Sequence, residues 1–511
     1  MLSSVLSCGL TGIDGFEVIV EMNLANGMPM FDVVGLPDAA VKESRERVRA
    51  AVKNAGFEFP AARLTANLAP ADLKKEGPAF DLPLALGILC CMGVFPAQAL
   101  EGMCVFGELS LDGSLRPVRG ALPMVISAVE RGVKEILLPA ANLNEVRCIE
   151  GARLYPAENL TAAVRHLTGQ LPIVPPEPVP YASIVAHREY AADFRHVKGQ
   201  TSAKRALEIA AAGGHNVLLI GPPGSGKTLM ARCMPTILPD MTFAEALETT
   251  RIHSVAGCVP PSGLLAERPF RSPHHTASHA SLVGGGNNAL PGEISKAHNG
   301  VLFLDELPEY RRDVLEALRQ PLEDGFVTIT RVNAQATYPA RFMLICSMNP
   351  CPCGHLGSRT QQCRCTPAEI RRYLNRISGP LLDRIDMHIE VESIPADRLA
   401  DLTEAEPSSD IRKRVCAARE LQHRRYGEDA GAIRCNAQLD ARTLARACPM
   451  SPAARELLLL SCERLKLSNR AYTRILKVAR TIADLEGASE ISDAHVSEAV
   501  QYRTLDRKYW G

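Results

Sequence analysis

The chain divides into stretches with different hydrophobic periods. Between residues 1 and 168, short alternating runs such as 16–21 and 63–68 predict half-buried strands, because successive side chains of a strand point to opposite faces. Apolar residues recur with a helical period in between, as at 38–54 and 82–91. This mixture predicts an N-terminal domain of the α+β or α/β class.

A proline-rich segment separates this domain from the next. Residues 171–180, LPIVPPEPVP, are too rich in proline for a helix interior or a central strand, so we assign residues 169–192 to a linker. Residues 193–395 contain strand-like apolar runs separated by helical patterns, which is typical of a parallel sheet covered by helices. The runs lie at 216–220, 301–304 and 342–347.

After about residue 395 the hydrophobic pattern becomes helical throughout. The helical stretches lie near 411–425, 441–447, 452–465, 468–486 and 493–502. We therefore expect a small all-α domain over residues 396–511. The predicted fold is a multidomain α/β protein with an α+β N-terminal domain, a parallel-sheet core and a helical C-terminal domain.

Composition narrows the class of protein. The 57 Lys and Arg residues balance 57 Asp and Glu residues, so no overall field attracts nucleic acid or a membrane, and any DNA contact must be local. Sixteen cysteines in a long chain do not resemble a compact secreted disulfide framework. Neither a signal peptide nor an apolar run of about 18 residues is evident. We expect a soluble, cytoplasmic protein without a membrane partner.

A phosphate-binding motif follows the first strand of the core. The sequence NVLLIGPPGSGKTLMARCM contains G-x-x-x-x-G-K-[ST] between a buried strand and a helix, which is the context that this motif requires. Its glycines let backbone amides face the phosphates, its lysine neutralises the outer phosphates, and its threonine hydroxyl ligates Mg²⁺. The predicted ATP-binding residues are Gly221, Pro222, Pro223, Gly224, Ser225, Gly226, Lys227 and Thr228.

Two later strands end in polar residues. The sequence GVLFLDEL places Asp305 and Glu306 at the carboxyl end of a buried strand, where open α/β sheets bind ligands. We expect Asp305 to hold Mg²⁺ with Thr228, and Glu306 to polarise the attacking water. The strand in RFMLICSMNP ends at Asn349, whose amide is suited to orient water beside the γ-phosphate. Alone, these residues also fit a solvated strand end and an Asn-Pro turn; together with the phosphate loop they favour an ATPase.

Four cysteines form two C-x-C pairs directly after Asn349. They are Cys351, Cys353, Cys363 and Cys365 in NPCPCGHLGSRTQQCRC. Four thiolates suit tetrahedral Zn²⁺, which would order a polar, glycine-rich loop. Because C-x-C is tighter than the usual C-x₂₋₄-C spacing of zinc sites, three alternatives stay open: His355 as a replacement ligand, buried free thiols, and a redox-active pair.

Two segments of the core are candidates for contact with a partner. Residues 268–288 carry basic and histidine side chains and a glycine run, and the histidines lack a clear metal-site partner. Residues 326–338 alternate around Val332-Asn333, which predicts a hairpin with Arg331 beside its tip. Basic loops suit a DNA backbone, because phosphate contacts need charge without sequence information. Packing between subunits is the alternative interpretation.

Together these motifs resemble the magnesium-chelatase-like AAA+ ATPases and, within them, the YifB/ComM group. Besides the phosphate loop, the resemblance rests on GLPDAAVKESRERVRAA, LAPADLKKEG, AAAGGHN, RPFRSPHHT, LDELPE, NPCPCG, SGPLLDRID and ARTIADLEG. It spans nearly the whole chain. It implies a homo-oligomeric ring, usually a hexamer, in which ATP lies between subunits.

The resemblance also assigns arginines to the site. It implies that Arg384 in LLDRID is an arginine finger that reaches the γ-phosphate of the adjacent subunit, with Arg376 as the alternative. A surface arginine held in a salt bridge is the other interpretation of each. Arg470 in SNRAYTRILKVAR resembles the arginine with which the helical domain senses nucleotide, and Arg474 one turn later competes for that role. The candidate catalytic residues are therefore Glu306, Asn349, Arg384 and Arg470.

The N-terminal domain resembles the protease domain of the Lon family. KEGPAFDLPLALGIL resembles its nucleophile region, and GELSLDGSLRPVRGALPM resembles its second catalytic segment. Ala79 stands where the nucleophilic Ser would be, and Leu122 stands where the activating Lys would be. Neither side chain can form or activate a nucleophile, so we expect no peptidase activity and a role in binding or ring assembly.

Three functions compete. The resemblance implies a DNA motor and helicase that promotes branch migration during homologous recombination and natural transformation, and we favour this function. A chelatase subunit that inserts Mg²⁺ into a porphyrin is the second, but such subunits normally lack the Lon-like domain. A protein-remodelling ATPase is the third; it is expected to have an aromatic pore loop, and HHTASHAS has no aromatic residue other than histidine.

Overall fold

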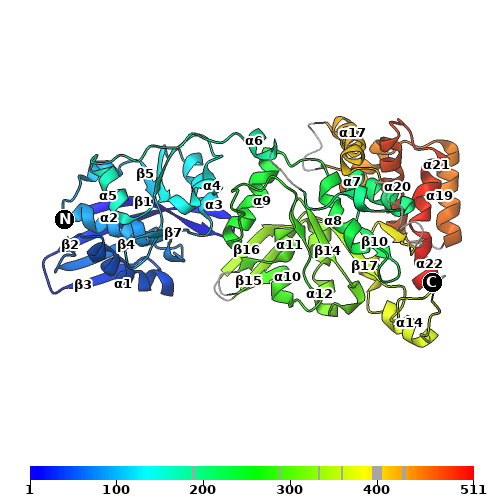
Figure 1. The fold of residues 1–511 in the computed structure, drawn as a ribbon, viewed down its shortest axis with the longest axis horizontal. Helices are drawn as coiled ribbons and strands as arrows, with labels where there is room; N and C mark the ends of the chain where they lie inside the picture. Colours follow the sequence, from blue (N-terminus) through cyan, green and yellow to red (C-terminus); the bar gives the residue numbers. More distant parts are fainter. Residues whose placement is uncertain are drawn as a thin grey trace. The chain divides into compact units, whose positions relative to one another are not determined.

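The computed structural model describes residues 1–186, 190–286, 289–331, 334–357, 361–393, 405–427, 433–465 and 467–510. The chain forms two compact units (Figure 1). Unit 1 combines Met1–His187 with Thr242–Ala266, and unit 2 combines Arg188–Met241 with Glu267–Gly511. The predicted boundary at 395/396 and the predicted hairpin tip at 332–333 lie outside the described residues.

Unit 1 is built on a mixed sheet. In its described residues the strand order is β3-β4-β2-β1-β5-β8-β9. The β1–β2 and β2–β4 pairs are antiparallel, and the remaining pairs are parallel. The strands are β1 (Leu2–Thr11), β2 (Asp14–Ala25), β3 (Met30–Val34), β4 (Arg63–Ala69), β5 (Met103–Val105), β8 (Glu135–Pro139) and β9 (Arg153–Ala157). The main helices are α1 (Ala39–Asn54), α2 (Asp81–Cys91), α3 (Ala121–Glu130) and α5 (Leu160–Leu167).

The two positions compared with a protease both lie in the interior of unit 1. Ala79 is buried directly before α2, and its carbonyl accepts a hydrogen bond of 2.8 Å from the amide of Gly107. Leu122 is fully buried in α3. Both side chains therefore pack as apolar core residues.

A helix from the ATPase region of the sequence belongs to unit 1. Helix α9 (Phe243–Ala256) starts with a capping box formed by Thr242 and Glu245, and it packs against α3. The Ser254 hydroxyl bonds to the buried Glu145 carboxylate, which also accepts a 3.1 Å hydrogen bond from the Leu122 amide. Residues 242–266 therefore belong to unit 1 and not to the continuous 193–395 core that we assigned. The sequence did not show this, because the period of an amphipathic helix does not indicate which neighbour covers its apolar face.

Unit 2 contains the parallel sheet predicted from the apolar runs. Its described strands have the order β11-β14-β17-β10-β18, and every neighbouring pair is parallel. They are β10 (Val217–Ile220), β11 (Phe270–Arg271), β14 (Val301–Leu304), β17 (Met343–Met348) and β18 (Met387–Glu390). β10, β14 and β17 are buried along their whole length, which explains their uninterrupted apolar sequences.

Helices and a hairpin surround this sheet. The helices include α7 (Thr201–Gly213), α8 (Lys227–Ile237), α10 (His279–Val283), α12 (Arg312–Glu316), α13 (Arg319–Asp324) and α14 (Pro367–Leu374). The strands β15 (Phe326–Arg331) and β16 (Ala334–Pro339) pair in an antiparallel hairpin, in agreement with their alternating sequence. Among the described residues, none of the helices has the length and apolar character needed to cross a membrane.

The C-terminal region is helical, as predicted. Its helices are α17 (Ser408–Tyr426), α18 (Ala441–Ala447), α19 (Pro452–Leu465), α20 (Asn469–Leu485), α21 (Asp493–Gln501) and α22 (Thr504–Trp510). The Ser468 hydroxyl caps α20 by accepting from the Ala471 amide. Apolar residues at positions such as 475, 478, 479 and 482 are buried, which lets α20 pack against α7, α17 and α21.

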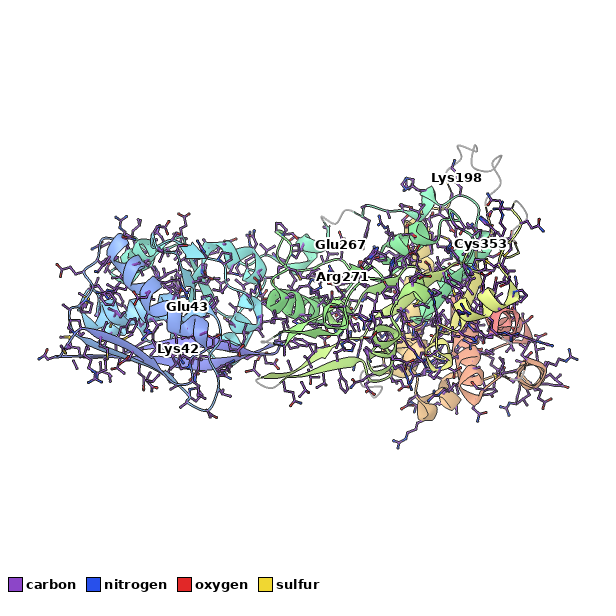
Figure 2. All side chains as sticks on the ribbon, turned by 90° about the horizontal axis from the view of Figure 1, so that it is seen from below. Lys42, Glu43, Lys198, Glu267, Arg271 and Cys353 are labelled. Carbon is purple, nitrogen blue, oxygen red and sulfur yellow. The ribbon has the colours of Figure 1, made fainter. Side chains whose placement is uncertain are left out.

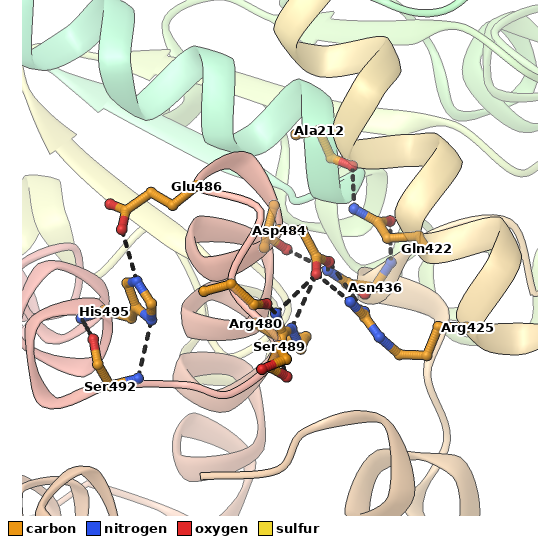
Figure 3. Close-up of polar contacts among 12 residues, drawn as sticks. Ala212, Gln422, Arg425, Asn436, Arg480, Asp484, Glu486, Ser489, Ser492 and His495 are labelled. Atoms are coloured by element: carbon orange, nitrogen blue, oxygen red, sulfur yellow. Dashed lines mark hydrogen bonds and ion pairs between the residues drawn. The ribbon is translucent and has the colours of Figure 1, made fainter. Parts of the chain in front are cut away.

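A buried polar cluster joins these helices (Figure 3). Asp484 of α20 is fully buried and accepts hydrogen bonds from Arg480 at 3.1 Å, Arg425 at 3.1 Å and Asn436 at 2.8 Å. Gln422 links the cluster to α7 by donating to the Ala212 carbonyl at 3.0 Å. One carboxylate therefore compensates the fully buried guanidinium of Arg480 and the partly exposed guanidinium of Arg425.

Replacing Asp484 by Asn tests the importance of this cluster. We expect Asp484→Asn to destabilise unit 2 by about 3 kcal/mol, because it leaves buried guanidinium charge without a counter-ion. The control Glu486→Gln changes a carboxylate that is 56% exposed and pairs with His495, so it should cost less than about 1 kcal/mol. Denaturant unfolding followed by the fluorescence of Trp510, the single tryptophan, measures both. Equal effects of the two substitutions would contradict the prediction.

Candidate functional site

The phosphate loop connects β10 to α8 in a conformation that its glycines permit. Gly224 and Gly226 have φ angles of 76° and 89°, in the left-handed region that other residues rarely adopt. Gly221 lies so close to the Val391 carbonyl that a side chain at this position would clash with β18's continuation. The loop therefore needs glycine at these three positions, and its amides precede a helix N-terminus, where phosphate binds well.

Lys227 crosses this loop from the start of α8. Its Nζ donates to the carbonyls of Gly221 at 2.7 Å and Pro222 at 2.8 Å, and lies 3.4 Å from Asn349 Oδ1. Burial lowers the pKa of Lys227 to about 8, against the opposing attraction of Asp305 and Glu306. The structure thus brings together the lysine and the amide that the sequence places 122 residues apart.

The two groups predicted to hold Mg²⁺ are also in contact. The Thr228 hydroxyl donates to Asp305 Oδ2 at 2.9 Å, and the other oxygen of Asp305 accepts from the Ser347 hydroxyl. Ser347 belongs to β17, the strand next to β14, so the sheet itself orients the carboxylate. A hydroxyl and a carboxylate at this spacing are oxygen ligands of the kind that Mg²⁺ prefers.

Glu306 follows Asp305 in an unusual backbone conformation. Its φ angle is 54°, and its amide donates to Asp305 Oδ1 at 3.1 Å. The Glu306 carboxylate is 56% exposed, and its Oε2 lies 3.3 Å from Nδ1 of His275. The sequence placed His275 in the segment proposed for contact with a partner but did not link it to Glu306. His275 follows β11, and only the pairing of β11 with β14 brings it beside Glu306.

Comparison with known proteins identifies the family of the chain. Residues 193–399 match the family described as magnesium chelatase, subunit ChlI, residues 20–142 match subunit ChlI of Mg-chelatase, and residues 405–503 match the ChlI C-terminal family. The chain is 45% identical to the uncharacterized protein YifB of Salmonella typhimurium, covering 97% of this chain and 96% of that protein. It is 44% identical to the competence protein ComM of Haemophilus influenzae, covering 99% and 98% of the two chains. The chain belongs to the YifB/ComM group of the magnesium-chelatase-like family.

A magnesium-chelatase subunit itself is less similar. The magnesium-chelatase 67 kDa subunit of Chlorobaculum parvum is 29% identical over 163 residues, which cover 31% of this chain and 23% of that subunit. The YifB/ComM relatives instead match the chain from the N-terminal unit to the C-terminal helices. The family assignment therefore includes both units of the chain.

The two arginines that the family resemblance proposes as the arginine finger lie in different environments. The Arg384 side chain is only 5% exposed; it donates to the Pro380 carbonyl at 2.6 Å and pairs with Glu323 of α13. The alternative, Arg376, is half exposed and pairs with Glu309 at 2.8 Å. Within one chain Arg384 thus has an internal partner, so an action on a neighbouring subunit requires its release from Glu323.

The two arginines of α20 are also distinguished by their contacts. Arg474 pairs with the buried Asp386, which precedes β18 and lies 3.5 Å from His215. Arg470 is exposed at the start of α20, and no hydrogen bond or ion pair engages its guanidinium among the described residues. Arg474 therefore has a structural partner in the sheet, whereas Arg470 is available to a ligand.

The four predicted cysteine ligands gather in one place (Figure 2 labels Cys353). Their sulfur atoms all lie within 4.8 Å of one another, with separations of 3.4 Å for Cys351–Cys353 and 3.6 Å from each of these to Cys363. Hydrogen bonds from the backbone amides of Arg364 and then His355 lower the pKa of Cys353 to about 6. In the described part of the chain, His355 does not belong to this group of possible metal ligands.

The cysteine loop contacts the phosphate loop. A Cβ built on Gly354 would lie 2.6 Å from Cδ of Pro223 and 3.8 Å from Cγ of Asn349. Burial raises the pKa of Tyr373 in α14, and the nearby backbone of Asn349 opposes this rise. The loop that carries the thiols is therefore packed between the nucleotide motif and the helix that follows it.

Replacing Gly354 by Ala tests this contact. The new methyl group would push Pro223, and we expect about tenfold weaker ATP binding, because small displacements of a positioning group are costly. Gly357→Ala is a matched control in the same loop, since its φ of 77° resembles the 82° of Gly354 but its Cβ would meet nothing within 4 Å. Titration with a fluorescent ATP analogue measures both affinities. An equal loss in both variants would attribute the effect to backbone strain alone.

Proposed function

We propose that the chain is an ATP-driven DNA motor that hydrolyses ATP at the carboxyl edge of the unit 2 sheet. The main support is the convergence of Lys227, Thr228 and Asp305, with Glu306 next to them. In this proposal Lys227 and the loop amides bind the phosphates, and Thr228 and Asp305 bind Mg²⁺. Bound Mg²⁺ would neutralise charge that develops on the phosphates during transfer.

Other groups of the site act on the attacking water. Glu306 is the proposed base that polarises it, and the Asn349 amide orients it. Arg384 is proposed to reach the nucleotide of the next subunit in a homo-oligomeric ring, which the family resemblance implies is a hexamer. Arg470 is proposed to contact the subunit's own nucleotide. These roles follow from the family resemblance and from the contacts described above.

The DNA substrate rests on two observations. The similar protein of Haemophilus influenzae is named a competence protein, and this name favours a role connected with DNA over a chelatase. Within that role, the family resemblance implies branch migration during homologous recombination and natural transformation. The segment after β11 also exposes His274 and His279, whereas Arg268 and Arg271 are engaged inside unit 2 by carbonyls and by Glu293. We therefore assign contact with DNA phosphates to the histidine part of this segment rather than to its arginines.

The proposal extends to the cell compartment and the first unit. Every cysteine of the chain lies in the described residues, and each is a free thiol, which fits a reducing cytoplasm.

We propose that unit 1 has the Lon-like fold and contributes to ring assembly or binding. It lacks peptidase activity in this proposal, because Ala79 and Leu122 offer no nucleophile.

We also propose that the cysteine group holds Zn²⁺. With Zn–S bonds of about 2.3 Å, a regular tetrahedron has sulfur–sulfur edges of about 3.8 Å. The separations of 3.4 and 3.6 Å among Cys351, Cys353 and Cys363 are close to this value. The sulfur of Cys365 lies within 4.8 Å of the other three, so the group comes near to the geometry that the ion requires. The proposed role is structural, since four sulfur ligands leave no open position for a substrate.

Hydrolysis and its dependence on Glu306 and DNA test the proposed function. We expect Glu306→Gln to lower ATP hydrolysis at least about 100-fold, as for loss of a general base, while ATP binding is kept. Single-stranded and branched DNA should stimulate the wild type, and the stimulation should fade as salt rises because counterions compete for the phosphates. Hydrolysis that needs Glu306 but ignores every DNA would keep the ATPase and reject the DNA motor.

Metal analysis tests the zinc site separately from activity. Elemental analysis of the purified protein should find about one zinc per chain, and Co²⁺ substitution should give the absorption of tetrahedral thiolate ligation. Cys363→Ser should lower the zinc content and weaken ATP binding through the loop contact at Pro223. Cys258→Ser, which changes an exposed cysteine outside the group, should alter neither. Equal metal content in the wild type and Cys363→Ser would reject the site.

A further inference from the structure

Asn216 links the strand that carries the phosphate loop to the segment that carries the proposed arginine finger. It stands directly before β10, and its side-chain Nδ2 donates to the carbonyl of Arg384 at 3.0 Å. We propose that Asn216 is a positioning residue for ATP hydrolysis, which holds Arg384 against the sheet so that its guanidinium can reach the nucleotide of the next subunit. This inference rests on the proposed function, because it concerns how the proposed finger is held.

All four polar atoms of Asn216 have partners, and these partners lie on both sides of β10. On the side of β17, Asn216 Oδ1 accepts from the Leu344 amide at 2.9 Å. On the side of β18, the Asn216 amide donates to Asp386 Oδ2 at 2.9 Å. Its carbonyl accepts from the amides of Asp386 at 3.0 Å and Met387 at 3.1 Å. The side chain therefore uses an acceptor for β17 and a donor for Arg384, a combination that a short amide supplies.

Side chains hold the turn in which Arg384 lies. The turn follows the short helix α15 (Gly379–Leu382), and carbonyls at the end of a helix need partners from outside it. The Arg384 carbonyl accepts from Asn216, and the next carbonyl, of Ile385, accepts from Arg503 Nη1 at 2.6 Å. The bond from Asn216 is the one that ties this turn to β10. A shift of Asn216 would therefore be passed to the backbone of Arg384.

β10 also leads into the phosphate loop. The strand is buried along Val217–Ile220 and is followed directly by Gly221. The loop that binds one nucleotide and the finger proposed for the neighbouring nucleotide therefore have a common support. Because neighbouring strands hold β10 on both sides, its two ends move together rather than independently.

The position of the Arg384 backbone matters because its side chain has to change partner. In the single chain the guanidinium pairs with Glu323 and donates to the Pro380 carbonyl. Once it leaves Glu323, the contacts of its backbone determine from where it reaches the phosphate. A misplacement of about 1 Å in a group that acts on the reacting atoms can lower the rate about 100-fold. Asn216 acts on the reaction only through Arg384 in this scheme.

The first measurement compares ATP hydrolysis and ATP binding by full-length variants. Asn216→Asp keeps the acceptor for the Leu344 amide and removes the donor to Arg384, whereas Asn216→Ala removes both without adding charge. We expect each to lower kcat at least about tenfold, because the finger is misplaced. The affinity for a fluorescent ATP analogue should match that of the wild type, since the phosphate loop is unchanged; this also shows that the variants fold. Asn54→Ala removes another amide bond to a carbonyl, to Leu111 in unit 1, and should keep the wild-type kcat.

The second measurement uses mixed rings, which separate a defect in the finger from a defect in a subunit's own site. Each Asn216 variant is co-expressed with Glu306→Gln, whose subunits have no base but an intact finger. In a head-to-tail ring with random order, about a quarter of the sites combine an intact base with an intact finger, so about a quarter of the wild-type rate should return. Arg384→Ala co-expressed with Glu306→Gln is the reference pair and should recover to the same extent.

The outcomes separate this inference from the proposed function. Recovery in the reference pair and in the Asn216 pairs supports the positioning role. Recovery in the reference pair alone, or weaker ATP binding by both Asn216 variants, would assign Asn216 to its own subunit's site and overturn the inference, while the finger stands. A wild-type kcat in both Asn216 variants would overturn it as well. Failure of the reference pair to recover would reject a finger that acts between subunits, and the inference would fall with that part of the proposed function.

Discussion

Burial of the parallel sheet on both faces constrains where unit 2 can place polar groups. The strands β10, β14 and β17 admit only apolar residues and Ser347, so ionisable groups must stand after the strand ends. Parallel strands bring those ends to one edge, and there Lys227, Asp305 and Asn349 come within reach of one another. The same burial lowers the pKa of Lys227, and two nearby carboxylates oppose that effect. The proposed nucleotide site is therefore a direct consequence of how the core is packed.

Buried polar groups determine how the C-terminal helices sit on this core. Asp386, next to β18, pairs with Arg474 of α20 and lies beside His215, whose Nε2 is 2.8 Å from the Thr481 hydroxyl. Burial lowers the pKa of His215, which favours its neutral form. Such contacts are directional, so they specify one arrangement of α20 where apolar packing alone tolerates several. These contacts fix α20 and thereby also the position of the exposed Arg470 at its start.

Each of the two units is built from segments that are separate in the sequence. The chain passes between the units at 187/188, 241/242 and 266/267, because α9 leaves the ATPase region and packs with unit 1. Its Ser254 contacts the buried Glu145, and the carbonyl of Ser254 accepts from the Gly120 amide at 3.1 Å. Unit 1 is consequently incomplete without a helix that the ATPase sequence supplies. A simple succession of domains along the sequence does not describe this protein.

Sequence alone determined the features that are local in the chain: the phosphate loop at 221–228, the Asp305-Glu306 pair after an apolar run, the paired cysteines and the helical C-terminal region. Each depends on neighbouring residues or on a short period, so each can be recognised without knowing what packs beside it. The tertiary structure decided which separate segments meet. It placed His275 on Glu306, Glu323 on Arg384, Asp386 on Arg474 and α9 on unit 1. Those contacts depend on strand order and helix packing, which bring together residues whose spacing along the chain carries no signal.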